Sequence, residues 1–127
     1  MTVTASKADT GRYHTQLEAE AARWLADADT PLGDGTLPDP HQLLDAALAA
    51  CTAITLRMYA ERKGLALDDV RVHIDHTEAG GVYTLNRRIE LVGEIDDAAR
   101  QRLMEIADRC PVHKTLSGQI VIATHAA

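Results

Sequence analysis

A long apolar segment with a clear start and a clear end, residues 40–63, constrains the fold of this chain more than any other feature. Asp39 is a favourable N-cap residue, and Pro40 suits the first position of a helix because it has no backbone N–H to satisfy. Gly64 favours a stop, since glycine easily adopts the left-handed conformation that follows many helices. These signals predict a helix of about 24 residues, about 36 Å long.

The helix expected at 40–63 is apolar on nearly all sides. Its central turns carry only two polar residues, Thr52 and Thr55. Such a helix is normally covered by other elements, and the chain has no Phe, one Trp and three Tyr to cover it. We therefore expect the helix to lie at the centre of a homodimer. A bilayer span is disfavoured, because Asp45 and Arg57 interrupt the apolar run.

The rest of the pattern predicts the α+β class, with one domain over residues 1–127. Two layers are expected, in which helices pack on a mostly antiparallel sheet. Alternating apolar residues predict strands, and a capped amphipathic stripe predicts a second helix. The expected order is β-β-α-β-β-α-β, with two strands within 11–28 and a turn near Glu20, a hairpin over 70–94, a helix over 97–110 that Asp96 caps, and a strand at 119–126.

Composition excludes several classes of protein. The net charge is -6 over 127 residues, so the chain lacks the basic surface that nucleic-acid binding requires. The first residues have neither a basic start nor an apolar core, which disfavours a signal peptide. We therefore expect a cytoplasmic protein with no membrane and no nucleic-acid partner, whose cysteines are normally reduced.

The only two cysteines, Cys51 and Cys110, fall in two different predicted helices. They are core residues, metal ligands or a redox pair. A metal site is disfavoured, because His41, His113 and the cysteines lack the short ligand spacings of known sites. The helix dipole disfavours an anion on Cys110 at a helix C-terminus, and Cys51 requires a cation from elsewhere in the fold. The remaining histidines are expected at the surface: His14, His73, His76 and His125.

Two segments resemble the OsmC/Ohr family of thiol-dependent hydroperoxide reductases and their relatives: DPHQLLDAALAACTAITLRMYAERKG and CPVHKTL. The resemblance implies an intertwined homodimer with the long helices at its centre and antiparallel sheet around them. It implies that Cys51 is the peroxidatic cysteine, which a hydroperoxide oxidises to a sulfenic acid. Cys110 would then resolve this acid to a disulfide, and an external dithiol of the lipoyl type would reduce the disulfide. The implied role is antioxidant, in a stress response, with no cofactor.

Two further positions of the family are less well matched. The reductases use an Arg from the N-terminal hairpin to hold the thiolate, for which Arg12 is the best candidate and Arg23 the second. A Glu that holds this Arg is replaced by His41, which offers no negative charge. Two functions therefore stay open: a reductase of organic hydroperoxides, or a non-peroxidatic OsmC-like protein that binds an apolar small molecule at the dimer interface.

Overall fold

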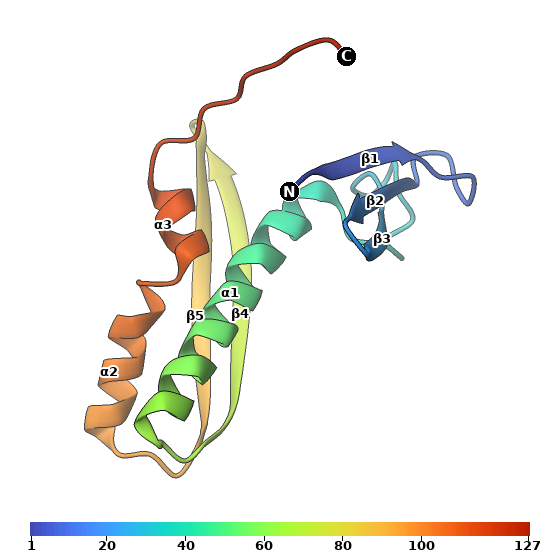
Figure 1. Ribbon diagram of the computed structural model, residues 1–127. Helices are drawn as coiled ribbons and strands as arrows, with labels where there is room; N and C mark the ends of the chain where they lie inside the picture. Colours follow the sequence, from blue (N-terminus) through green and yellow to red (C-terminus); the bar gives the residue numbers. More distant parts are fainter. The chain divides into compact units, whose positions relative to one another are not determined.

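The computed structural model describes all residues, 1–127. The chain forms two compact units, Met1–Leu44 and Asp45–Ala127. Its mixture of helices and antiparallel strands confirms the α+β class, whereas the assignment of residues 1–127 to a single domain stays a prediction. The elements, labelled in Figure 1, are β1 (Val3–Lys7), β2 (Thr15–Ala19), β3 (Ala22–Ala26), α1 (Pro40–Lys63), β4 (Leu67–Ala79), β5 (Val82–Gly93), α2 (Asp97–Ala107) and α3 (Pro111–Ser117).

The first unit contains an antiparallel sheet in the order β1-β2-β3. The two strands predicted within 11–28 are confirmed as β2 and β3, and the turn between them contains Glu20 at a positive φ of 52°. Strand β1 was not predicted. All five of its residues are exposed, so it has no buried face and therefore no alternating apolar pattern to detect.

Helix α1 begins and ends where the sequence predicts. Asp39 and Gln42 form a reciprocal capping box, in which each side chain accepts from the other residue's backbone N–H at 2.9 Å. At the other end Gly64 has φ of 65°. The Leu65 N–H there reaches back to the Ala60 carbonyl at 2.9 Å, which satisfies a carbonyl that the helix itself leaves open.

The second unit is built on a long hairpin of β4 and β5, which confirms the hairpin predicted over 70–94. Gly80 and Gly81 join the strands, both at positive φ, as a two-residue hairpin turn requires. Helices α1 and α2 run along this hairpin (Figure 1). The buried residues that hold the three elements together are Leu56, Val70, Leu103, Ile106 and Ala107.

The predicted end of the chain is wrong in two respects. The helix expected over 97–110 stops at Ala107, and a separate short helix, α3, starts at Pro111. Proline has no N–H for a helix interior and disfavours the α conformation in the residue before it; Cys110 is accordingly extended. The strand expected at 119–126 is absent, because no strand of this chain pairs with it.

Helix α1 buries only one stripe of side chains within its own chain. The buried residues are Leu48, Thr52, Leu56 and Ala60. Ile54 and Met58 are 52% and 61% exposed, so the expectation that α1 is covered on all sides is not met by one chain. By length and composition alone α1 would also be able to cross a membrane, a test that the central helix of a folded domain passes as well.

Candidate functional site

Both thiols hydrogen-bond to the first turn of α3. The Cys51 sulfur accepts from the backbone N–H of Val112 at 3.5 Å, and the Cys110 sulfur accepts from that of His113 at 3.2 Å. Both cysteines are free thiols; Cys110 is fully buried, while Cys51 is partly exposed. Two cysteines 59 positions apart in the sequence are thus bound to consecutive amides, with Cys51 the more accessible of the two.

The electrostatic expectation for Cys110 is wrong. The residue does not end a helix whose carbonyls face it, because α2 stops at Ala107. Cys110 is instead the N-cap of α3, and its sulfur takes the position of a capping acceptor. The local backbone therefore presents an N–H donor to this sulfur, where the sequence had predicted only acceptors.

Thr52, the neighbour of Cys51, connects the two cysteines. Its hydroxyl donates its single proton to the Leu48 carbonyl at 2.7 Å. Its oxygen lies 3.8 Å from the Cys110 sulfur. Because the hydroxyl proton is already committed, this contact is an S–H of Cys110 donating to Thr52. The hydrogen bonds thus describe Cys110 as a thiol that donates to Thr52 and accepts from His113.

The main residue that sequence reasoning missed is Arg87 on β5. Its side chain is only 12% exposed, and four acceptors surround it. Nη1 donates to the Thr52 hydroxyl at 3.1 Å and to the Ala107 carbonyl at 3.3 Å. Nη2 donates to the Asp108 carboxylate at 2.9 Å and to the His113 ring at 3.1 Å. One guanidinium therefore ties α1, the end of α2 and α3 together around Cys110.

The sequence contains a signal that points to Arg87. Side chains alternate between the two faces of a strand, and the inward face of β5 is formed by Tyr83, Leu85, Arg87, Ile89 and Leu91. An arginine in the middle of an otherwise apolar face costs free energy unless it is paired. Such a position is a candidate site, and the same reasoning separates Arg87 from the exposed Arg88 beside it.

His113 has a defined role in this network. A guanidinium only donates hydrogen bonds, so the His113 Nδ1, 3.1 Å from Arg87, must be the acceptor. The ring is therefore neutral and carries its proton on Nε2. Asp108, whose side chain is 68% exposed, supplies the one negative charge in contact with Arg87. A cavity of about 430 Å³ opens beside this network, lined by Leu48, Tyr83, Thr84, Leu85, Arg87, His113, Leu116 and Ser117.

The predicted activating residues lie in the first unit. Arg12 is exposed and lies over the Tyr13 ring, 5.2 Å from its centroid. Arg23 is exposed and 3.9 Å from Glu18. His41 is an exposed residue of the first turn of α1. Their roles toward Cys51 stay predictions, and the arginine that the structure brings to the cysteine pair within the second unit is Arg87.

Two histidines expected at the surface are partly buried, His14 more than His76. His14 is 14% exposed, with its Nε2 3.4 Å from the carboxylate of buried Asp27. These two residues and Asp34 form a group of possible metal ligands in the first unit that includes neither cysteine. His76 lies on the inward face of β4 and hydrogen-bonds to Asp45. The alternation that places Val72 inward also places His76 there, so its partial burial was predictable.

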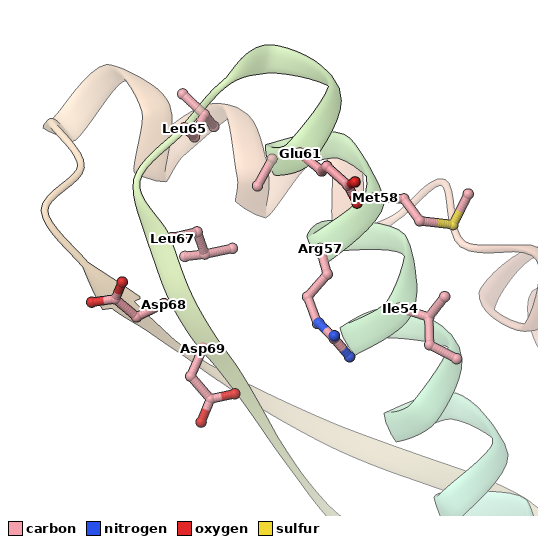
Figure 2. A pocket seen from close by; sticks show the side chains of 9 residues that line it. Ile54, Arg57, Met58, Glu61, Leu65, Leu67, Asp68 and Asp69 are labelled. Carbon is pink, nitrogen blue, oxygen red and sulfur yellow. The ribbon is translucent and has the colours of Figure 1, made fainter.

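A larger cavity than the one beside Arg87 lies at another part of the second unit, with a volume of about 520 Å³. Figure 2 shows its walls, which are the C-terminal half of α1 and the start of β4. Its labelled side chains include Arg57 and Glu61 on the helix and Asp68 and Asp69 on the strand. Neither cysteine lines this cavity, so size alone does not identify the site.

Comparison with solved structures finds proteins with the fold of this chain. The OsmC-like protein from Mycoplasma pneumoniae is 20% identical and has a TM-score of 0.77, over 92% of this chain and 86% of that one. The organic hydroperoxide resistance protein OhrB of Bacillus subtilis is 22% identical with a TM-score of 0.62, over 92% and 90%. The organic hydroperoxide resistance protein OsmC from Legionella pneumophila is 21% identical with a TM-score of 0.63, over 92% and 88%.

These solved structures share the fold of this chain. Among curated proteins, none matches it. The family model described as OsmC-like protein matches residues 33–125, a range that includes α1, the hairpin, Arg87 and both cysteines. The chain therefore belongs to the OsmC-like protein family.

Proposed function

We propose that this protein is a thiol-dependent reductase of organic hydroperoxides, with Cys51 as the peroxidatic and Cys110 as the resolving cysteine. The observation that carries the proposal is the convergence of two free thiols on the consecutive amides of Val112 and His113. The accessible thiol is suited to meet a peroxide, and the buried one to react with its product. Membership of the family, with hydroperoxide resistance proteins among the similar structures, supports the same reaction.

The proposed reaction has three steps. The Cys51 thiolate attacks the O–O bond of the hydroperoxide, so the sulfur becomes a sulfenic acid and the alcohol leaves after protonation. The Cys110 sulfur then attacks the Cys51 sulfur, which forms a disulfide and releases water. An external dithiol, of the lipoyl type, reduces this disulfide by thiol–disulfide exchange. Such a cycle needs a reducing compartment, and we place the protein in the cytoplasm.

We also propose that the active form is a homodimer. Within one chain α1 leaves Ile54 and Met58 exposed, and Met104 on α2 is 47% exposed. The tail beyond α3 carries three further exposed apolar residues, Ile120, Val121 and Ile122. Exposed apolar residues gathered on neighbouring elements are typical of an interface. A second copy offers the same surfaces, so the helices and the tails of two chains can cover one another.

The proposed function is tested by peroxide consumption with dihydrolipoamide as reductant, comparing an organic hydroperoxide with hydrogen peroxide. Wild-type protein should consume the organic hydroperoxide faster. Cys51→Ser should abolish turnover, since no sulfenic acid can form. Cys110→Ser should allow a single oxidation, and a dimedone-type trap should then label Cys51 in mass spectrometry. Label on Cys110 would reverse the assignment, and two free thiols after peroxide treatment would contradict the proposal.

A second function is favoured by one residue. His41 stands where the resemblance leads us to expect a Glu, so the negative charge that would hold an activating arginine is missing there. The alternative is a non-peroxidatic OsmC-like protein that binds an apolar small molecule at the dimer interface. His41→Glu separates the two: it should raise peroxide turnover if Arg12 or Arg23 serves Cys51. Unchanged, negligible turnover would favour the binding function.

A further inference from the structure

We propose that Arg87 is a positioning residue for the second thiol: acting through Thr52 and His113, it holds Cys110 in place and favours its thiolate when this sulfur attacks Cys51. The inference rests on the proposed function in one respect, namely that the two cysteines form a disulfide. Arg87 lies outside both cysteine-containing sequence motifs, in the middle of β5.

The first argument is that Arg87 is enclosed and that both of its terminal nitrogens are hydrogen-bonded. A guanidinium that is 12% exposed must be compensated by acceptors. All four of its acceptors lie within 3.3 Å, and they belong to the segments that flank the cysteines: Thr52 next to Cys51, Ala107 and Asp108 before Cys110, and His113 after it. One side chain therefore links α1 to the residues on both sides of Cys110.

The second argument concerns the proton of Cys110. In the resting arrangement the S–H donates to Thr52, whose own proton is held by the Leu48 carbonyl. When Cys110 loses its proton, Thr52 can rotate this hydroxyl toward the sulfur and donate to it instead. Arg87 stays bound to the same oxygen, so its Nη1 lies at most about 7 Å from the sulfur, and its positive charge attracts the thiolate in a site shielded from water.

The third argument is the balance of charge around Cys110. Arg87 on β5 is positive, and Asp108 at the end of α2 offsets part of this charge from an exposed position. Thr52 on α1 is neutral. His113 on α3 accepts from Arg87 and is therefore neutral too. The net charge near the Cys110 sulfur is therefore positive, because Asp108 offsets only part of the charge of Arg87.

The step itself is balanced without another reactant. The Cys110 sulfur forms a bond to the Cys51 sulfur, and the S–O bond of the sulfenic acid breaks. The leaving hydroxide takes up the proton that Cys110 gave up and departs as water. The Cys110 sulfur supplies the electron pair of the new bond, so Cys110 is oxidised and the sulfenic sulfur of Cys51 is reduced to the common oxidation level of a disulfide.

The experiment replaces peroxide by an aromatic disulfide reagent whose thiolate is coloured. The reagent first couples to Cys51 and releases one equivalent of colour. Cys110 then attacks the mixed disulfide, closes the Cys51–Cys110 bond and releases a second equivalent. The two releases are followed separately over a range of pH for wild type, Arg87→Met and Arg87→Lys. Arg88→Gln is the matched control, because Arg88 is the next residue on β5 and is 69% exposed.

In Arg87→Met the second release should be about tenfold slower at neutral pH, and the midpoint of its pH profile should move to higher pH, because the cation that attracts the thiolate is removed. The first release should stay close to that of wild type. Arg87→Lys should recover part of the effect, because it keeps the charge but loses the paired donors. A purely structural clamp would change the rate but leave the midpoint in place. Circular dichroism and thermal melting confirm that each variant is folded.

The inference is overturned if the second release in Arg87→Met matches that in Arg88→Gln in rate and midpoint. A wild-type protein that releases one equivalent and closes no disulfide overturns it as well. This assay uses no peroxide, so it tests closure of the disulfide separately from reduction of a peroxide. Disulfide closure that depends on Arg87, in a protein that consumes no peroxide, would support the inference and reject the reductase.

Discussion

The side chain of Arg87 contacts residues next to both cysteines. The residue is predictable in principle, because the alternation of β5 places it on the inward face between Leu85 and Ile89. Its partners are not, since they lie 20 to 35 positions away and depend on the packing of α1, α2 and α3. For the cysteines too, one part was predictable from the sequence and another part was not. Their family motif is visible in the sequence, whereas the N-cap geometry of Cys110 is produced by tertiary packing and Pro111.

At the residue scale the structure also predicts a titration. The pKa of Asp34 is lowered, chiefly because the Thr36 hydroxyl donates a hydrogen bond to the carboxylate and secondly because the Thr36 N–H does. Because the pKa of this carboxyl is lower in the folded protein, its ionisation stabilises the fold at pH values above its ordinary pKa. This contribution is lost as the pH falls through the pKa of the folded state. Thr36→Val removes the hydroxyl donor, so the pKa of Asp34 should rise.

Titration of the Asp34 side-chain carbonyl by nuclear magnetic resonance measures this change. Thr77→Val is the control: Thr77 is an exposed residue of β4, and its replacement should leave the pKa of Asp34 unchanged. A pKa for Asp34 that is the same with and without the Thr36 hydroxyl would show that this hydrogen bond does not form in solution.

At the scale of elements, local chemistry explains which parts were predictable. Helix α1 has its own capping box and its own glycine stop, so both its ends are set by nearby residues. The β4–β5 hairpin likewise has its two-glycine turn. The break between α2 and α3 follows from Pro111, which the sequence displays. The missing strand at 119–126 could not be foreseen, because strand formation needs a partner and the pattern alone does not supply one.

Gly93, at the end of β5, gives the prediction at this scale. Its φ is 147°, and a Cβ there would lie 2.2 Å from the Ala66 carbonyl oxygen. Gly93→Ala should therefore lower the free energy of unfolding by about 2 kcal/mol or more. Gly80→Ala is the control, because its φ is 57° but a Cβ would meet nothing within 4 Å; it should cost about 1 kcal/mol. Urea unfolding followed by circular dichroism measures both, and equal losses would contradict the steric argument.

At the scale of the whole molecule, the exposed side of α1 predicts the state of assembly. Light scattering at micromolar concentration should give twice the 13.8 kDa of one chain. Ile54→Lys places a charge among these exposed apolar residues and should shift the protein toward the monomer or destabilise it. Lys7→Gln, on an exposed strand of the first unit, should leave the mass unchanged. A wild-type monomer with native circular dichroism would rule the homodimer out.

The attachment of each thiol to one amide has a consequence for observing the protein. The N–H of Val112 donates to the Cys51 sulfur, and the N–H of His113 donates to the Cys110 sulfur. Oxidation of either sulfur therefore alters the electronic environment of one identifiable backbone nitrogen. Two neighbouring resonances thus act as separate, intrinsic reporters, one for each cysteine. A spectroscopist can follow the chemical history of both sulfurs in the unmodified chain, without attaching a label to the thiols themselves.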